Sequence, residues 1–549
     1  MKSAAPAWQL LLAFVLSLLF LSSLIGWLQN VHIVTTNGMY KSLQAAPWIS
    51  DPAHAKLDAS NYLYFPLYGR LCALLDFLGI LRGQAWKQFA YLNAFWASVG
   101  SVLVYVFAHR LTGSAIAAAA ATVFHLGIGF VLLLSVINED IMPGYVVMLG
   151  SMLLAALWFD RPTRRQVAVV GVVFTLGWLI EWRLIFPTLP ALLLALAISE
   201  GTIRHRATLI GTLLLSILLT TTLVQLPWIG HPGSAGVLGL LWTGKGVDSG
   251  WGGFTWEKPW LLLSGVSSYF FMDDVPFSAG AARDVALKLA VPVVLELAIF
   301  AACVALLWRR HGERRLWAIA AVFLGTLVAG EVFNTYGQPQ DPQMQVNVMA
   351  WLPIAWMLIL GASLATRPLL WALVALSFVP AVLNVRSLVP SRGQDARAVR
   401  AVASLEKRFP PDSTVFVYWG FEPITMWQFA LWSQTWDWDY VERPPAAPQR
   451  DPRFKWIAID AGAIRHPKWS GEQHAEALMH DIDYALDHGY RVVISDVWNW
   501  DVETLANQLG TLAAANRAPT IHAMLRAHYA VGPGFEVPGV GTYYELRRR

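Results

Sequence analysis

Residues 92–124 read "LNAFWASVGSVLVYVFAHRLTGSAIAAAAATVF" and form two apolar runs around a short basic turn. The two apolar windows, 92–110 and 114–136, each approach the roughly 20 residues that a helix needs to cross a bilayer. The turn between them carries His109 and Arg110. The stretch therefore predicts two helices that cross a membrane in opposite directions.

The composition of the whole chain agrees with a polytopic membrane protein. Of its 549 residues, 56% are hydrophobic and 14% are charged, whereas soluble domains have about 25% charged residues. The mean hydropathy is +0.47. The net charge of +4 is small and scattered, which argues against a nucleic-acid partner. Both cysteines, Cys72 and Cys303, lie in apolar stretches, so no disulfide framework is implied.

Eleven windows have the length and hydropathy of membrane spans. They are 8–28, 92–110, 114–136, 142–159, 166–182, 184–199, 207–227, 289–308, 315–333, 346–364 and 368–386. We interpret the first window as an uncleaved helix, because no A-x-A cleavage site follows it. Segment 62–82 is also apolar, but it carries Arg70 and Asp76. It is therefore predicted to be an amphipathic helix in the outer interface.

The basic residues orient these spans. Arginines gather in alternate connections, namely 109–113, 160–166, 200–206, 309–315 and 365–367. The positive-inside rule makes that side cytoplasmic. The opposite connections, 29–91, 137–141, 228–288 and 334–345, are predicted to face outward. The N-terminus is then cytoplasmic and the C-terminal part lies outside the cytoplasm.

From about residue 387 the pattern changes to short strands that alternate with helices. "STVFVYWG", "FKWIAIDA" and "RVVISDVWN" are rich in β-branched and aromatic residues, and "SGEQHAEALMHDIDYALDHGY" has helical periodicity. This pattern predicts an α/β domain with a largely parallel sheet, with a proline-rich loop at 442–453. The chain thus divides into a membrane domain, 1–386, and an extracytoplasmic α/β domain, 387–549.

Polar residues that suggest chemistry gather in the outward connections. Carboxylates there can accept a proton, hold a metal or bind a polar substrate. The candidates are Asp51 and Asp58 in loop 29–91, Glu139 and Asp140 in "NEDIMPGY", Trp256 in "DSGWGGFTWEKPW", and Asp341 and Gln343 in "NTYGQPQDPQMQVN".

Each candidate also has a structural interpretation. Glu139 and Asp140 precede a helix, and carboxylates are favoured at helix N-termini. Two acids exceed what a cap needs, so we expect one to cap the helix and the other to face a polar chamber. Asp51 before Pro52 is typical of a turn, and Asp58 suits the N-cap of the interfacial helix.

Charges within the apolar windows need partners. Arg183 can bind phosphate through its bidentate fork, or it can form an interfacial ion pair with Glu181. Glu296 is predicted to face the interior of the bundle, because charge in contact with lipid is costly. His32, His54 and His231 are too scattered for a metal site, although the acids leave room for a divalent cation.

Three stretches together resemble the membrane glycosyltransferases of the GT-C fold, the group that includes protein O-mannosyltransferases and aminoarabinose transferases. They are "YFPLYGRLCALLDFLGI" (64–80), which ends a large first outer loop, the two-helix stretch 92–124, and the acid-bearing turn "NEDIMPGY" (138–145). The resemblance covers residues 8–200 well and 330–365 loosely.

The resemblance implies transfer of a sugar from a polyprenyl-phosphate carrier to an acceptor hydroxyl, with inversion, at the outer face of the membrane. An acid of the first outer loop then acts as the general base, here Asp58 or Asp51, and basic side chains such as Arg183 and Arg70 hold the phosphate. The sequence departs from the family at Asn37 in "TTNGMY", where members often have an aspartate. An amide is not a base at neutral pH.

The predicted function is polyprenyl-phosphate-dependent sugar transfer to a glycan, lipid or protein acceptor, and the resemblance implies a bacterial inner membrane. Two alternatives remain. A transporter of a lipid-linked glycan would place charges at mid-membrane and often contains an internal repeat, and no clear repeat is found. A non-catalytic partner that keeps the fold and binds a glycan or an envelope protein would explain Asn37.

Overall fold

The computed structural model describes residues 5–31, 41, 45, 47–49, 52–53, 55, 57–58, 62–231, 253–272, 279–310, 312–410, 413–418, 456–459, 469–508, 516–538 and 541–549. Asn37, Asp51 and the proline-rich loop 442–453 lie outside these residues. The chain divides into two compact units, and the boundary in its C-terminal half falls between Arg392 and Gly393.

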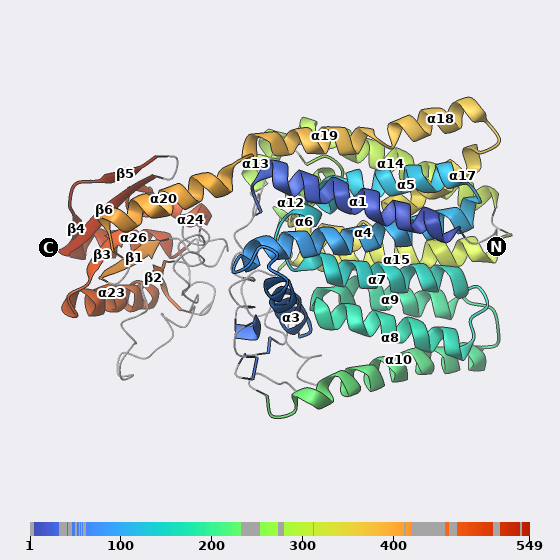
Figure 1. Cartoon of the computed structure of the whole chain (residues 1–549), viewed down its shortest axis with the longest axis horizontal. Helices are drawn as coiled ribbons and strands as arrows, with labels where there is room; N and C mark the ends of the chain where they lie inside the picture. The colour runs from blue at the N-terminus through green and yellow to red at the C-terminus, as the bar shows by residue number, and fades with distance from the viewer. Residues whose placement is uncertain are drawn as a thin grey trace. The chain divides into compact units, whose positions relative to one another are not determined.

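The first unit is a bundle of apolar helices (Figure 1). Within the described residues, seven helical segments are long and apolar enough to span a membrane. They are α1 (Ala7–Leu28), α4 (Ala85–Thr112), α7 (Ile141–Trp158), α10 (Ile203–Gln225, extended by η2, Leu226–Trp228), α14 (Ala286–Arg309), α15 (Arg314–Tyr336), and the segment from Arg367 that contains α18 (Arg367–Leu376) and α19 (Val379–Leu388).

Two further spans are bent helix pairs. The break between α5 (Ala115–Gly127) and α6 (Gly129–Val136) turns the chain by 71°, and α16 (Pro342–Val348) meets α17 (Trp351–Ser363) at 41°. At the first break, a Cβ on Gly127 would lie 2.7 Å from the backbone nitrogen of Ala381. The glycine therefore lets α19 pack directly against the bend.

All eleven predicted windows contain helix, but two of the helices are short for a span. α8 (Arg164–Ile180) has 17 residues and α9 (Ile185–Ala197) has 13, and the 3-10 turn η1 (Trp182–Leu184) separates them. By length and hydropathy the described residues therefore contain seven spans, or up to nine with the bent pairs. The membrane-protein fold is confirmed, and the predicted count of eleven spans is higher than this number, partly because α8 and α9 are short.

The basic connections meet at one end of the bundle. Glu200 accepts a 2.5 Å hydrogen bond from Arg161 and lies 3.8 Å from Arg314, so three predicted cytoplasmic connections are neighbours. At the same end, Gly361 of α17 approaches Thr112 at the end of α4. The alternation of basic connections along the sequence predicted that they would lie together on one side of the bundle.

Short helices complete the first unit. The predicted interfacial helix is α3 (Tyr64–Phe77), which buries Tyr64, Phe65 and Tyr68 and leaves Arg70 exposed. With 14 residues it is about 21 Å long, too short to cross the hydrocarbon core. α12 (Lys258–Phe270) and α13 (Ala279–Asp284) lie in the outer connection 228–288.

The second unit contains a six-stranded mixed sheet with the order β2-β1-β3-β6-β4, and β5 pairs with β6. The strands are β1 (Thr414–Tyr418), β2 (Trp456–Ala458), β3 (Arg491–Ile494), β4 (Tyr529–Val531), β5 (Phe535–Val537) and β6 (Gly541–Arg548). β1 runs parallel to β2 and β3, as predicted, whereas the unpredicted β4, β5 and β6 form the antiparallel part.

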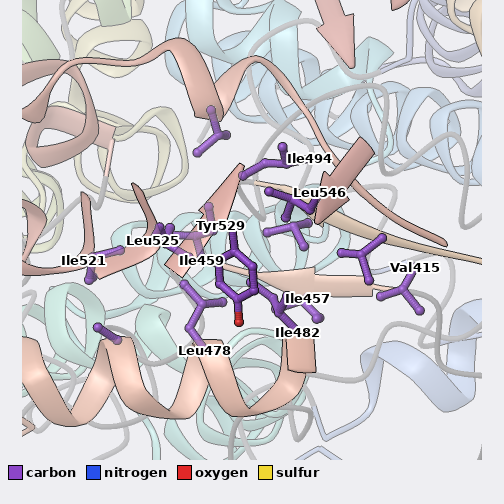
Figure 2. Close-up of a cluster of buried hydrophobic side chains, with 14 of the residues drawn as sticks. Val415, Ile457, Ile459, Leu478, Ile482, Ile494, Ile521, Leu525, Tyr529 and Leu546 are labelled. Carbon is purple, nitrogen blue, oxygen red and sulfur yellow. The ribbon is translucent and has the colours of Figure 1, made fainter. Parts of the chain in front are cut away.

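Helices cover both faces of this sheet. α23 (Gly471–Asp487), α24 (Val502–Gln508) and α26 (Ala518–His528) share a core with the strands, which Figure 2 shows around Tyr529. On the other face, Phe409 after α20 (Gln394–Arg408) packs edge-on against Phe416 of β1. β1 is therefore buried on both faces, which explains its uninterrupted apolar sequence. Each fully buried aliphatic side chain contributes about 1.5–3 kcal/mol.

Candidate active site

The predicted outer connections come together at the end of the bundle opposite Glu200. The backbone N–H of Asn138 donates to the carbonyl of Val31 at 2.9 Å, and the N–H of Leu63 donates to the carbonyl of Leu179 at 2.8 Å. The ammonium of Lys258 donates to the carbonyl of Gly337. These bonds join the first outer loop to the acid turn and to α8, and join α12 to the connection after α15.

The acid turn, residues 137–140, is held by a buried amide. Asn93 of α4 donates its side-chain N–H groups to the carbonyls of Ile137 at 2.7 Å and Glu139 at 2.6 Å. Its own oxygen accepts a 2.6 Å hydrogen bond from the hydroxyl of Tyr68. Asn93 therefore fixes the backbone that carries the two acids and links it to α3.

Glu181 and Arg183 form a buried ion pair. The guanidinium donates from Nε to Oε1 at 2.6 Å and from Nη2 to Oε2 at 2.9 Å, a bidentate arrangement. Glu181 is fully buried and the Arg183 side chain is 13% exposed. A Cβ on Gly144 would lie 2.7 Å from the Cβ of Glu181, so glycine in the first turn of α7 lets the pair approach the acid turn.

Gln343 connects this pair to the acid turn. Its side-chain oxygen accepts a 2.7 Å hydrogen bond from Nη1 of Arg183, and its nitrogen donates to Oε2 of Glu139 at 2.6 Å. Asp140 lies on the same guanidinium, with Oδ1 at 3.7 Å from Nη2. We call Glu139, Asp140, Glu181, Arg183 and Gln343 the acid chamber. Three of the five N–H groups of Arg183 donate to Glu181 and Gln343.

The expectation that one acid of the turn caps α7 is wrong for Asp140. It occupies the N-cap position, but its backbone is helical and its side chain makes no capping bond. Glu139 instead directs its carboxylate to Gln343. Both acids are at most 1% exposed. Because the turn is buried, its acids have side chains from other parts of the sequence as partners.

The capping role belongs to Asp341. Its carboxylate accepts a 2.8 Å hydrogen bond from the N–H of Gln343 at the start of α16, where Pro342 occupies the first helical position. Burial raises the pKa of Asp341, and Arg183 acts in the opposite direction. Asp341 therefore sets the start of α16 and, with it, the position of Gln343.

Tyr64 is a further group beside the chamber. Its ring stacks on Tyr68 with the centroids 4.3 Å apart, and its hydroxyl is buried without a hydrogen-bond partner. Burial is the main cause that raises its pKa well above the ordinary value, and the acid turn adds to it. The hydroxyl thus keeps its proton and can donate a hydrogen bond.

The remaining candidate residues are not members of the acid chamber. Asp58 is partly exposed just before α3, Arg70 is exposed on α3, and Trp256 is 95% exposed before α12. Within the described part of the chain, no three His, Cys, Asp or Glu side chains are grouped to hold a metal ion.

The sequence pointed to the charged members of the chamber but not to the groups that hold them. Asn93, Tyr68 and Tyr64 were missed because they lie in apolar or aromatic stretches. One feature of the sequence could have identified Asn93, because an amide side chain within a spanning helix needs a polar partner.

Comparison with known proteins identifies the fold of the chain. No protein-family model matches the sequence, and no curated protein matches it significantly. ArnT, the aminoarabinose transferase of Cupriavidus metallidurans, is similar in its crystal structure bound to undecaprenyl phosphate. The TM-score is 0.52 at 12% identity, over 98% of each chain. Apo ArnT gives 0.52 at 14% identity, over 97% of each chain. The likeness confirms the GT-C fold.

Proposed function

We propose that the chain transfers a sugar from a polyprenyl-phosphate carrier to an acceptor hydroxyl at the outer face of the membrane. The single observation that carries the proposal is the acid chamber. It brings three carboxylates and one guanidinium from the acid turn and residues 181–183 together with the distant amide of Gln343 in one buried cluster. The fold supports the same proposal, since ArnT has it and was crystallised with undecaprenyl phosphate.

Each part of the reaction has a candidate group. The two N–H groups of Arg183 that do not donate to Glu181 or Gln343 suit a phosphate oxygen, for which a guanidinium is a charge-assisted donor. One carboxylate, Glu139, Asp140 or Asp58, accepts the proton of the acceptor hydroxyl. The acceptor oxygen then bonds to the anomeric carbon as the bond from that carbon to the phosphate oxygen breaks. The polyprenyl phosphate leaves as an anion and needs no proton.

Reconstituted protein supplied with radiolabelled polyprenyl-phosphate sugars and an envelope lipid extract tests this proposal. The wild type should label an acceptor. Replacing the general base should reduce the rate by about 10²- to 10⁴-fold, so Glu139→Gln, Asp140→Asn and Asp58→Asn should be unequal. Equal, full activity in all three would refute the assigned base.

The non-catalytic alternative makes a different prediction. A binding partner that keeps the fold would retain polyprenyl-phosphate or glycan binding and would transfer no label under any condition. Asn37 is the sequence feature that favours it. Restoring an acid there, as Asn37→Asp, should create transfer only if this position is the missing base.

The proposed orientation places the N-terminus in the cytoplasm and the second unit outside it, in an inner membrane. The basic connections at one end of the bundle support it through the positive-inside rule. A reporter active only outside the cytoplasm should be active after Arg549 and silent within 160–166. The opposite pattern would place the chamber on the cytoplasmic face.

A further inference from the structure

The segment that precedes and begins α12 contacts the outer end of α15. The backbone N–H of Gly253 donates to the carbonyl of Tyr336 at 2.8 Å. The rings of Phe254 and Tyr336 meet edge to face, with their centroids 5.6 Å apart. The ammonium of Lys258 donates to the carbonyl of Gly337 and, at 3.4 Å, to that of Tyr336. Three separate contacts thus hold this segment at the last residues of α15.

A lysine suits this place for a physical reason. The last carbonyl groups of an α-helix have no N–H partner within the helix, and the helix dipole makes that end partly negative. Lys258 is only 8% exposed, so its ammonium needs acceptors within the protein. Each group therefore satisfies the other, and Lys258 fixes where α15 ends and where the following turn begins.

The turn after α15, residues 337–341, also packs directly on α12. A Cβ on Gly265 of α12 would overlap the carbonyl oxygen of Pro339, so glycine is what allows the two backbones to touch. The same carbonyl accepts a 2.7 Å hydrogen bond from the side-chain nitrogen of Gln345 in α16. The turn is therefore held by both α12 and α16.

This turn determines the position of Gln343 in the acid chamber. Asp341, the last residue of the turn, accepts a 2.8 Å hydrogen bond from the N–H of Gln343 and begins α16. The side chain of Gln343 then accepts from Arg183 at 2.7 Å and donates to Glu139 at 2.6 Å. An unbroken series of contacts therefore runs from Lys258 through the turn to the charged groups of the chamber.

We propose that Lys258 is a positioning residue of the acid chamber, which acts on the binding of a polyprenyl phosphate through Gln343. The inference rests on the proposed function and makes the second outer connection part of the site. Lys258 keeps the turn and α16 in the position that presents Gln343 to Arg183, so the guanidinium is oriented before the phosphate arrives. A preorganised donor binds more tightly because less conformational freedom is lost on binding.

The affinity of the full-length protein for undecaprenyl phosphate tests this role. Lys258→Met keeps most of the side chain and removes the ammonium. A displaced Gln343 leaves Arg183 without one ordinary hydrogen bond, so binding should weaken by about 2- to 10-fold. Lys258→Arg, which keeps a cation beside the end of α15, should retain most of the affinity. Lys407→Met, at an exposed lysine of α20 in the second unit, is the matched control and should bind as wild type does.

A double-mutant cycle separates a positioning role from general destabilisation. Gln343→Met alone should weaken binding. Adding Lys258→Met should then weaken it by less than about twofold more, because the second change acts through the residue already removed. Two independent changes would instead multiply their effects on affinity. Thermal unfolding midpoints in detergent establish that each variant compared is folded.

Hydrogen exchange gives a second measurement that needs no ligand. Lys258→Met should raise the exchange of backbone amides in a peptide covering 338–349, which contains the N–H of Gln343, while peptides from α20 stay unchanged. If the wild type binds no undecaprenyl phosphate, the proposed function fails, and the exchange measurement still decides whether Lys258 holds the turn. Wild-type affinity in folded Lys258→Met, equal losses in Lys258→Met and Lys258→Arg, effects that multiply with Gln343→Met, or unchanged exchange at 338–349 would each overturn the proposal.

Discussion

The carboxyl groups of the acid chamber and the carboxyl group of Glu296 in α14 are similarly buried but have different partners. In the acid chamber, Glu181 has a bidentate guanidinium and Glu139 has the amide of Gln343. Glu296, in the middle of α14, has neither. Burial alone therefore does not define the role of an acid in this membrane unit. A paired acid maintains the architecture of a site, whereas Glu296 holds no other side chain through a hydrogen bond.

The largest effect on stability should follow from removing one member of the chamber's ion pair. Glu181→Gln removes the bidentate partner of Arg183 and leaves more distant carboxylates, Asp140 at 3.7 Å and Asp341, as its charged neighbours. Breaking a buried pair by removing one partner costs about 3–5 kcal/mol. Denaturation of the purified protein by SDS in mixed micelles would measure the change in unfolding free energy.

Glu296→Gln, measured in the same way, is the comparison for Glu181→Gln. Glu296→Gln leaves no buried cation without a partner, so this variant should be as stable as wild type or more stable. Equal losses at Glu181 and Glu296 would show that the distinction between paired and unpaired acids has no energetic consequence.

A smaller contrast is expected between two stacked tyrosines. Tyr68→Phe removes the donor to Asn93, and a buried acceptor left without its partner costs about 1–3 kcal/mol. Tyr64→Phe should cost little, because that hydroxyl has no hydrogen-bond partner to lose. If Tyr64 contacts substrate, the same variant should lower activity in the transfer assay while the unfolding midpoint stays unchanged.

Much of the fold could be predicted from the sequence because the spans depend on hydropathy and charge alternation, which are local properties. The 71° break after Gly127 could not, because it depends on the close approach of Ala381, more than 250 residues away. The strands β4, β5 and β6 were missed because the sequence had no strong alternating pattern after residue 530.

The candidate site was partly predictable for the same reason. Charged residues in outer connections are visible in the sequence, so Glu139, Asp140 and Arg183 were found. Their partnerships were not, because they depend on which helix ends meet. Asp140 satisfies every local rule for a helix cap, yet it lies beside Arg183.

The smallest effect concerns the exposed charges of the second unit. Arg548 donates to Asp483 at 2.8 Å and to Asp487 at 2.6 Å, and it lowers the pKa of Asp487. A lowered folded-state pKa stabilises the protein above the unfolded-state pKa, and this contribution is lost as the pH falls through the folded-state value. Arg548→Ala should therefore be slightly less stable than wild type at neutral pH.

The difference between wild type and Arg548→Ala should shrink in acid and in high salt, which screens exposed charges. Unfolding midpoints from pH 3 to pH 7, at low and high salt, would measure it. A difference in unfolding midpoint that grows as the pH falls would contradict the conclusion that Arg548 stabilises the folded protein through Asp487.

The affinity for undecaprenyl phosphate tests the central claim, that the acid chamber holds the phosphate of a polyprenyl carrier. The comparison is between wild type and the double variant Glu181→Gln/Arg183→Met, which removes the guanidinium without leaving its buried partner charged. Arg548→Met, in the second unit, is the control. Loss of a charge-assisted hydrogen bond is worth about 1.5–3 kcal/mol, so the double variant should bind roughly 10- to 150-fold more weakly while the control binds as wild type does. Wild-type affinity in a folded double variant would contradict the claim.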